Sequence, residues 1–430
     1  MSIRVIKPKK EIKGTYVVPG DKSISHRSII LGAIADGTTV IHNFLKGDDC
    51  MATISCFRQM GVSISFSDDH LLVQGVGLHG LKKPEVVLET GNSGTTTRLM
   101  AGLLCGQSFS SILSGDTSLN KRPMNRIITP LSQMNAQIKS LKNNGCAPLK
   151  ITPSNLHGMD YTSPVASAQV KSALLLAGLY AKEKTRVIEP SLSRNHTELM
   201  LQAFGADITT DTSDSNRCIA SITPGNKLVP WEIDIPGDIS SAAYLIAAGL
   251  LVPNSELLIK NVGVNETRGG FLHVVKSMGG NIALENKRTY GGEPVADIWV
   301  KTSSLKGITI EGSIIPTLID EIPMLAILAS RAQGTTKIKD AAELTVKETN
   351  RIETISKNLS RMGGHVTPTP DGLIIEGSDI PLHGAEIDSA YDHRIAMAFA
   401  IAALIARGDT RIEGAQAVDV SFPGFFDYFG

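Results

Sequence analysis

The chain has 430 residues, of which 42% are apolar, and its 42 basic side chains are balanced by 42 acidic ones. A chain of this length exceeds one ordinary domain and predicts two or three. Zero net charge argues against nucleic-acid or membrane-surface binding, because such partners need a broadly basic face.

Cysteine usage and apolar runs point to the same class of protein. The five cysteines show no spacing typical of disulfides or zinc, and the amino terminus has no apolar signal segment. The longest apolar run, 395–406, is too short to span a bilayer and predicts a buried helix. We therefore expect a cytoplasmic protein with no membrane or nucleic-acid partner.

The first periodic segment is a predicted helix from Ser23 to Ala35, with apolar residues at helical spacing and Gly37 behind it. A strand is expected at 38–44, and a second helix begins at the acidic pair Asp48–Asp49. Two further strands are expected at 62–66 and 70–75. The first unit therefore reads helix, strand, helix, strand, strand.

This order recurs along the chain. A helix end with a Met or Phe before Gly or Asn marks the repeats, and the Met or Phe stands at positions 60, 134, 204, 278 and 362. A period of roughly 72 residues makes six units, of which the last, from Tyr391, stops after its second helix. We expect residues 1–20 to supply the missing strands of that last unit.

The repeats predict two lobes of three units each. The first is expected to span 21–235, and the second to combine 1–20 with 236–430, so that two chain crossings near Gly20 and Pro236–Gly237 form a hinge. This is an α/β (α+β) organisation, because helices and strands alternate in every unit.

The predicted helix starts carry small and hydroxyl residues, which ordinarily cap helices. Helix starts also present free N–H groups and a positive dipole end, which suit anions. Capping does not explain the basic residues near these starts, which are Lys22, Arg27, Arg98, Lys171 and Arg394. We therefore predict an anion site that the two lobes share.

Other patterns do not indicate a nucleotide or metal site. The GxGxxG match at 75–80 is not followed by a helix and predicts a turn between strands. The segment Gly20-Asp-Lys-Ser lacks the upstream glycine of a nucleotide-binding P-loop. The ten histidines contain no HxH or HExxH pattern, so we expect no catalytic metal.

The second lobe combines acids with cations at Asp320–Glu321, in the segment VKETNR at 346–351, and at Asp392–Arg394. If VKETNR is helical, Lys347 and Arg351 lie on one face. An ordinary surface ion-pair network that includes Glu348 remains an equal alternative for this segment alone.

Taken in chain order, GDKSISHR, GNSGTTTR, KRP, ASAQ, SRNHTE, IDE, VKETNR and YDHR resemble the 5-enolpyruvylshikimate-3-phosphate synthase (3-phosphoshikimate 1-carboxyvinyltransferase) family. The resemblance covers essentially the whole chain. It implies two similar lobes, each of three βαβαββ repeats in an inside-out α/β barrel, with the active site in the cleft between them.

The resemblance also implies a reaction. The enolpyruvyl group of phosphoenolpyruvate is transferred to the 5-hydroxyl of shikimate 3-phosphate and phosphate is released, on the route through chorismate to the aromatic amino acids. No cofactor and no metal is implied. We expect a monomer whose partners are these two small molecules.

Residue roles follow from the same resemblance. The positions that match those at shikimate 3-phosphate are Lys22, Ser23, Arg27, Ser167, Ala168, Gln169, Arg194, Asp320 and Lys347. The positions that match those at phosphoenolpyruvate, where glyphosate competes, are Lys22, Asn92, Gly94, Arg122, Gln169, Lys347, Arg351 and Arg394. Asp320 matches the base or orienting group for the 5-hydroxyl, and Glu348 with Lys22 matches the proton-transfer groups at carbon and phosphate.

The chain departs from the family pattern twice. Ala168 stands where many members have a second serine, and Val420 stands where many have a lysine. Both departures bear on substrate affinity more than on the type of reaction.

Two alternatives remain. UDP-N-acetylglucosamine enolpyruvyl transferases resemble this family in fold and chemistry, but use a cysteine in the loop before the Arg-Pro pair, and residues 113–122 contain none. A non-catalytic anion-binding relative would keep the fold. The retention of Asp320 and Glu348 argues against it, because an anion binder gains nothing from acids among its cations.

Overall fold

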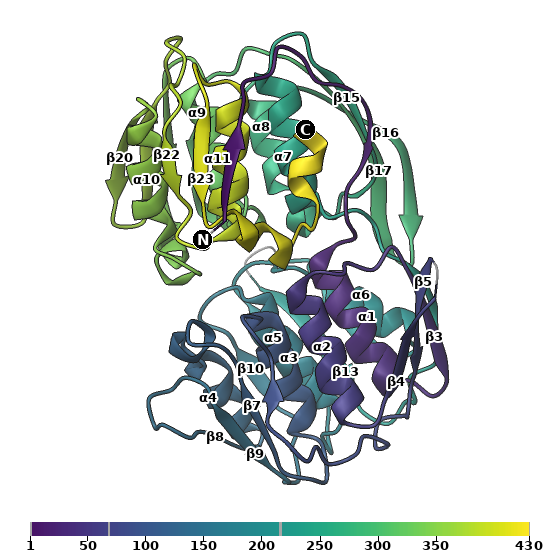
Figure 1. The fold of residues 1–430 in the computed structure, drawn as a ribbon. Coiled ribbons are helices and arrows are strands. Elements are labelled where there is room, and N and C mark those ends of the chain that lie inside the picture. The colour runs from purple at the N-terminus through teal and green to yellow at the C-terminus, as the bar shows by residue number, and fades with distance from the viewer. Residues whose placement is uncertain (1, 68, 215–216, 430) are drawn as a thin grey trace. The chain divides into compact units, whose positions relative to one another are not determined.

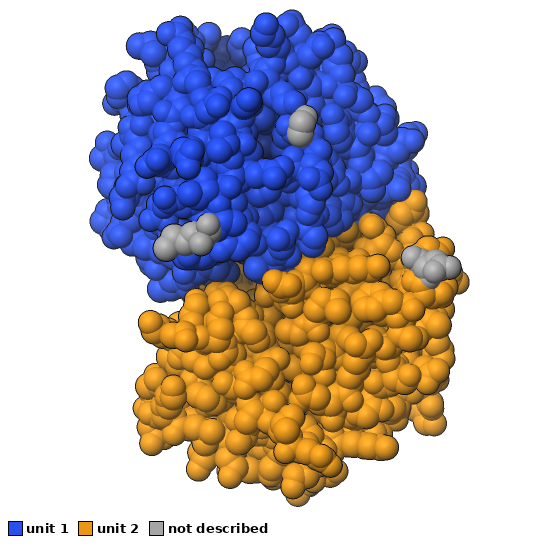
Figure 2. All heavy atoms as spheres, in the orientation of Figure 1, with its two compact units in different colours: residues 1–19, 236–288, 294–430 blue, residues 20–235, 289–293 orange. Residues whose placement is uncertain are grey.

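The computed structural model describes residues 2–67, 69–214 and 217–429. By compactness the chain divides into unit 1, residues 1–19, 236–288 and 294–430, and unit 2, residues 20–235 and 289–293 (Figure 2). The chain therefore changes unit between Pro19 and Gly20 and again between Ile235 and Pro236. Among the described residues, no helix is long and apolar enough to cross a membrane.

Unit 2 contains α1 to α6 and β3 to β14. Its helices are α1 (Lys22–Ile34), α2 (Asp48–Gln59), α3 (Gly94–Leu104), α4 (Asn125–Gln133), α5 (Ala168–Gly178) and α6 (His196–Ala203), with a 3-10 turn at Leu119–Lys121. Its strands are β3 (Thr38–His42), β4 (Ser63–Phe66), β5 (His70–Gln74), β6 (Leu88–Glu89), β7 (Ser111–Ser114), β8 (Gln137–Ser140), β9 (Leu149–Thr152), β10 (Asp160–Thr162), β11 (Thr185–Glu189), β12 (Asp207–Asp211), β13 (Cys218–Thr223) and β14 (Glu232–Asp234).

Unit 1 contains the remaining elements, and the turn that joins its strands β16 and β17 groups with unit 2. Its helices are α7 (Ile239–Leu251), α8 (Gly270–Ser277), α9 (Ile322–Ser330), α10 (Arg351–Arg361) and α11 (His393–Leu404), with 3-10 segments at Glu266–Arg268, Gly312–Thr317, Ala342–Val346, Ala415–Val420 and Phe425–Phe429. Its strands are β1 (Ile3–Ile6), β2 (Lys13–Val17), β15 (Glu256–Gly263), β16 (Asn281–Tyr290), β17 (Glu293–Lys301), β18 (Thr309–Ile310), β19 (Thr335–Ile338), β20 (His365–Thr369), β21 (Gly372–Glu376), β22 (Glu386–Asp388) and β23 (Thr410–Glu413).

The strands of the described residues form six open sheets with one recurring topology. In the sheet β6-β7-β9-β8, the leading strand β6 runs parallel to β7, while β9 is antiparallel to both β7 and β8. Helices α3 and α4 follow β6 and β7, which makes the unit βαβαββ. The predicted elements of the first unit, a helix at 23–35 and strands at 38–44, 62–66 and 70–75, are confirmed by α1, β3, β4 and β5.

The leading strands at the two crossings are exchanged. Strand β2 directly precedes α1 in the chain, yet it pairs with β15, with Lys13 opposite Glu256. Strand β14 directly precedes α7, yet it pairs with β3, with Glu232 opposite Val40.

The expectation that residues 1–20 complete the last unit is therefore only half right. Strand β1 does pair with β23, but β2 completes the sheet of the fourth unit. The pairing of β2 joins residues more than 240 positions apart, and local sequence carries no signal for such a partner.

Each unit has its own hydrophobic core, built around helices that are buried on almost every side. In unit 2 these are α1, α3 and α5, and in unit 1 they are α7, α9 and α11 (Figure 1). Helix α11 confirms the buried helix expected at 395–406. The inner helices pack closely: a Cβ added at Gly102 of α3 would lie 2.1 Å from the Ala173 carbonyl oxygen of α5.

Candidate active site

In unit 2, hydrogen bonds of the predicted site residue Gln169 connect the starts of α3 and α5. Arg98 Nη1 donates to Gln169 Oε1 at 2.6 Å, and Gln169 Nε2 donates to Thr95 Oγ1 at 3.2 Å. The helix starts therefore meet at one place, as an anion site built from helix N-termini requires. Arg98 is not among the binding residues that the family resemblance predicts, although its position near a helix start marks it as a candidate cation.

Arg27 ties α1 to the same region. Its Nε donates to Thr197 Oγ1 at 2.6 Å, its Nη2 to Ser172 Oγ at 2.8 Å and its Nη1 to the Ser23 carbonyl at 3.0 Å. Burial, helped to a smaller extent by the nearby cation Arg194, lowers the pKa of Arg27 to about 10 against the opposing effect of Glu198 and other acids. Arg27 remains charged at neutral pH, and an anion beside these two arginines would relieve their repulsion.

Ser167 precedes α5, and a carboxylate from the end of β11 holds its backbone. The Ser167 amide donates to Glu189 Oε1 at 2.8 Å, while its hydroxyl makes no capping hydrogen bond. Glu189 also accepts from the Ser193 hydroxyl at 2.8 Å, so one carboxylate fixes both Ser167 and the loop that carries Arg194. Sequence reasoning did not identify Glu189, because a lone acid at a strand end has no local signature.

Lys171 has a different role from the one predicted. Its side chain is 2% exposed, and its Nζ lies 2.9 Å from Glu189 and 2.8 Å from Glu198. Burial would lower the pKa of Lys171, but Glu198 and Glu189 outweigh burial and raise it. Lys171 therefore balances two internal carboxylates and is not a substrate cation.

At the start of α1, Lys22 Nζ lies 2.5 Å from Asp49 Oδ2, and both side chains are partly accessible. Asp21 caps the helix by accepting from the Ile24 amide at 2.9 Å. The capping interpretation therefore holds for Asp21, while Lys22 extends to the start of α2. Ala168, the first residue of α5, is partly buried.

Gly94 faces two arginines. A Cβ added there would lie 2.9 Å from Arg98 Nη1 and 3.6 Å from Arg122 Nη1. Gly94 is not among the glycines with positive φ, so its backbone conformation does not require glycine. Arg122 donates to Asn92, which in turn donates to Asp116 at 2.7 Å.

Unit 1 gathers the predicted acids with the remaining predicted cations. Asp320 Oδ1 lies 3.6 Å from Lys347 Nζ and 3.7 Å from Arg351 Nη1, and the Asp320 carbonyl accepts from Arg394 Nη1 at 3.3 Å. The side chains of Asp320 and Lys347 are 16% and 20% exposed. Ligands could therefore reach both.

Lys347 and Arg351 would share one helical face only if VKETNR were helical, and this condition is not met. The 3-10 segment ends at Val346, Lys347 has extended backbone angles, and α10 begins only at Arg351, with Asn350 as its cap. The two cations converge through the fold of this turn, and Asp320 is the group they share.

Arg351 is 1% exposed and is held by two acids. Its Nε donates to Asp392 Oδ2 at 2.7 Å and its Nη2 to Glu348 Oε2 at 2.6 Å. Burial would lower the pKa of Arg351, but Asp392 and Glu348 outweigh burial and raise it. Asp392 also caps α11 by accepting from the Arg394 amide at 2.9 Å. The alternative of a mere surface network does not fit a guanidinium this deeply buried.

A buried layer supports Asp320 and Arg394. Glu321, 2% exposed, accepts from the Ser240 hydroxyl at the start of α7 and lies 3.6 Å from Arg394 Nη1 and 3.7 Å from Arg268 Nη2. Sequence reasoning singled out Glu321 but missed Arg268, which lies in a 3-10 turn with no motif of its own.

The structure thus forms two groups from the predicted residues. The group in unit 2 comprises Lys22, Ser23, Arg27, Asn92, Gly94, Arg122, Ser167, Ala168, Gln169 and Arg194. The group in unit 1 comprises Asp320, Lys347, Glu348, Arg351 and Arg394. The first group offers cations, amides and hydroxyls for anions, and the second adds carboxylates that can move protons.

Comparison with known proteins finds one family that matches almost the whole chain. A family model for EPSP synthase (3-phosphoshikimate 1-carboxyvinyltransferase) matches residues 6–429. The chain is 56% identical over 418 residues to the 3-phosphoshikimate 1-carboxyvinyltransferase of Brevibacillus brevis, covering 97% of both. It is 52% identical over 424 residues to that of a Thermoanaerobacter species, covering 99% of this chain and 98% of the relative.

Solved structures agree. The EPSP synthase of Acinetobacter baumannii superposes with a TM-score of 0.87 at 46% identity, covering 99% of this chain and 97% of that one. The enolpyruvyl transferase NikO of Streptomyces tendae superposes with a TM-score of 0.80 at 16% identity, covering 99% and 96%, which shows the fold alone. The predicted fold class, an α/β chain of the two-lobed enolpyruvyl transferase type, is confirmed.

Proposed function

This chain belongs to the EPSP synthase (3-phosphoshikimate 1-carboxyvinyltransferase) family, and from that premise we propose how its residues divide the reaction. The enzyme transfers the enolpyruvyl group of phosphoenolpyruvate to the 5-hydroxyl of shikimate 3-phosphate and releases phosphate, a step of aromatic amino acid biosynthesis. The relatives reported above are named 3-phosphoshikimate 1-carboxyvinyltransferases, which argues against a UDP-N-acetylglucosamine enolpyruvyl transferase, and the retention of Asp320 and Glu348 argues against a non-catalytic relative.

Shikimate 3-phosphate is assigned to the helix starts of unit 2. Arg27 and Arg194 supply charge for its phosphate, and Ser23, Ser167 and Gln169 supply hydrogen bonds. The support is the proximity of the two arginines and the Ser167 hydroxyl, which is not used for capping. Ala168 contributes its backbone at the start of α5 and no hydroxyl.

Phosphoenolpyruvate is assigned to cations from both units. Lys22 and Arg122, with Asn92 and Gly94, come from unit 2, while Lys347, Arg351 and Arg394 come from unit 1. A phosphate and a carboxylate on one small molecule need several such donors, and guanidinium groups bind each of them with two hydrogen bonds.

The acid–base steps are assigned to Asp320, Glu348 and Lys22. Asp320 takes the proton of the 5-hydroxyl, whose oxygen attacks C2 of phosphoenolpyruvate while Glu348 protonates the methylene carbon. The tetrahedral intermediate then loses its phosphate, to which Lys22 donates a proton, while a proton of the methyl group returns to Glu348. Asp320 releases the proton of the 5-hydroxyl to solvent and Lys22 regains one from solvent, so that each group ends in its starting state. The cations beside Asp320 favour its carboxylate form, as a base requires.

The observation that carries this proposal is that the two kinds of candidate residue lie in different units. The candidate acids lie in unit 1, and the candidate phosphate-binding arginines Arg27 and Arg194 lie in unit 2. We propose that turnover uses residues of both units at one substrate pair, as the sequence predicts. The predicted lobes, 21–235 and 1–20 with 236–430, are proposed as the bodies that meet around it.

Isosteric substitutions test the chemical roles. We expect Asp320→Asn and Glu348→Gln to reduce kcat by about 10² or more in a phosphate-release assay with both substrates. Calorimetry should show that Glu348→Gln still binds shikimate 3-phosphate, because the proposed role of Glu348 is to protonate the methylene carbon of phosphoenolpyruvate. Near-normal turnover in Glu348→Gln would remove it from the mechanism.

We further propose that the enzyme is cytoplasmic and acts as a monomer. The chain alone supplies every residue to which the reaction is assigned. Light scattering on the purified enzyme tests the second point, and a mass of twice the 45.8 kDa chain would contradict it.

A further inference from the structure

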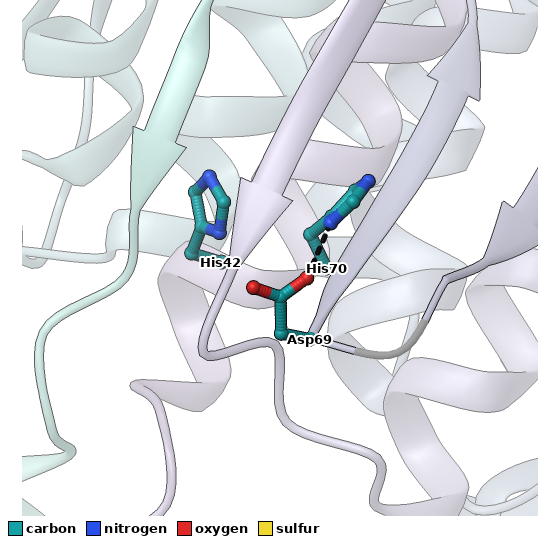
Figure 3. Close-up of side chains that lie close together, drawn as sticks. All are labelled: His42, Asp69 and His70. Carbon is teal, nitrogen blue, oxygen red and sulfur yellow. Dashed lines mark hydrogen bonds and ion pairs between the residues drawn. The ribbon is translucent and has the colours of Figure 1, made fainter.

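Two histidines of unit 2 lie side by side on the outer face of the sheet β14-β3-β5-β4. His42 ends β3, His70 begins β5, and the antiparallel register places them directly opposite each other. Their neighbours Ile41 and Leu71 are fully buried, so the alternation of the strands turns both histidines away from the core. The two rings lie 5.7 Å apart between centroids (Figure 3).

A carboxylate joins this pair. Asp69 directly precedes β5, and its Oδ1 lies 2.6 Å from His70 Nδ1 (Figure 3). One potential ligand atom from each of His42, Asp69 and His70 lies within 4.8 Å of the other two. Two imidazoles and a carboxylate are a ligand set that divalent transition ions prefer, and they leave a fourth position for water.

We propose that His42, His70 and Asp69 form a zinc-binding site on the outer face of this sheet. The side chains of His42 and His70 are 30% and 26% exposed, and that of Asp69 is 79% exposed. An ion can therefore enter from solvent. The exposed carboxylate and imidazoles can also rotate by the small amount needed to bring their ligand atoms to about 2.0–2.2 Å from Zn²⁺.

Glu232 supplies the supporting contact. It lies on β14, and its Oε1 is 3.0 Å from His42 Nε2. A carboxylate bonded to one nitrogen of a ligating histidine fixes its tautomer and orients the ring toward the metal. Glu232 lies three residues before the crossing from unit 2 to unit 1. The ion would thus link β14, β3 and β5 where the chain leaves this unit.

This site is separate from the residues assigned to catalysis. None of its ligands is among those residues. His42 and His70 lie on the outer face of a sheet, whereas the catalytic candidate Lys22 begins the buried helix α1 and Asp320 and Glu348 belong to unit 1. The ion is therefore structural: it stabilises the fold, because it binds the native sheet and not the unfolded chain.

Titration calorimetry with ZnCl₂ tests the proposal on untagged enzyme that has first been freed of metal with a chelator. We expect one Zn²⁺ per chain and no binding of Mg²⁺, which prefers oxygen ligands. His42→Gln and His70→Gln should each abolish this binding, and Glu232→Gln should weaken it about 10- to 100-fold. Zn²⁺ should raise Tm for the wild type but not for the His42→Gln, His70→Gln double variant.

Two matched variants serve as controls. His157→Gln removes another exposed histidine of unit 2, which lies 3.7 Å from Glu183, and should bind Zn²⁺ like the wild type. Cys146→Ser removes the least buried thiol and should also leave binding intact. Absence of Zn²⁺ binding by the wild type, unchanged binding by His42→Gln and His70→Gln, or loss of binding in Cys146→Ser would each overturn the proposal.

Discussion

At the scale of single residues, we expect Gly94 to govern selectivity between inhibitor and substrate. Its backbone conformation does not require glycine, and a methyl group there would press on the Arg98 guanidinium at 2.9 Å and approach that of Arg122 at 3.6 Å. The missing side chain therefore leaves room beside two cations. Because glyphosate is longer than phosphoenolpyruvate, an added methyl should disturb the inhibitor more than the substrate.

We expect the wild type to be sensitive to glyphosate. Gly94→Ala should raise the inhibition constant for glyphosate about tenfold more than the KM for phosphoenolpyruvate, which corresponds to a differential clash of ~1.4 kcal/mol. Steady-state kinetics with glyphosate as a competitive inhibitor measure both constants. Equal increases in the two, or a wild type that resists millimolar inhibitor, would contradict this reading of Gly94.

At the scale of elements, the end of β11 positions the start of α5. Glu189 holds the Ser167 amide and the Ser193 hydroxyl, both at 2.8 Å, and pairs with the buried Lys171. Glu189→Gln keeps the shape of the side chain but removes its negative charge, and so weakens its contacts with Ser167, Ser193 and Lys171. The KM for shikimate 3-phosphate should rise about tenfold or more, as expected for a loss of ~1.4 kcal/mol, with a smaller effect on kcat.

Removing one partner of a buried ion pair can also destabilise the fold, so a milder variant accompanies this test. Ser193→Ala deletes only the hydroxyl contact and should raise the same KM to a smaller extent. Glu183→Gln, which alters an exposed acid of unit 2, is the matched control. An unchanged KM for shikimate 3-phosphate in both Glu189→Gln and Ser193→Ala would show that Glu189 has no positioning role.

A buried histidine of helix α1 leads us to expect that the folded state loses stability in acid. His26 is buried on this helix with its Nδ1 2.8 Å from Thr53 Oγ1 of α2. Burial, reinforced by Lys22 and Arg27, lowers the pKa of His26 well below its usual 6.5. Below pH 6.5 the unfolded chain binds a proton that the native state excludes, so native stability must fall as the pH falls.

Urea unfolding at pH 7.5 and pH 5.5 measures this loss. For His26 alone the slope approaches about 1.4 kcal/mol per pH unit below 6.5. His26→Gln should reduce the difference between the two pH values by about that amount, whatever its own effect on stability. The same pH dependence in His26→Gln and the wild type would assign the acid sensitivity to other groups.

At the scale of the whole molecule, charge predicts a response to substrate. Candidate substrate cations occur in both units, Lys22, Arg27 and Arg122 in one and Lys347 and Arg394 in the other. If these cations serve one site, as proposed above, they repel each other until an anion binds, and ligand binding then favours a more closed arrangement. Small-angle X-ray scattering should therefore show a smaller radius of gyration when shikimate 3-phosphate is added. An unchanged radius at saturating ligand would refute this expectation.

The sequence by itself determined the repeat, the class of fold and the family. Helix periodicity, helix-end signals and alternation act over a few residues, so the elements of the first unit and the buried helix α11 could be predicted locally. The matching segments from GDKSISHR to YDHR identified the reaction for the same reason. Arg27, Gln169, Asp320 and Arg351 could be predicted as site residues because each lies in such a segment.

Only the tertiary structure decided what depends on contacts between distant segments. The exchange of β2 and β14, the withdrawal of Lys171 into an internal ion pair and the anchoring role of Glu189 all arise from long-range pairing. The same holds for His42 and His70, which are 28 positions apart and show no metal motif, yet become direct neighbours through the register of β3 and β5. A linear pattern records spacing along the chain, whereas a site depends on distance in space, and sheet pairing sets that distance.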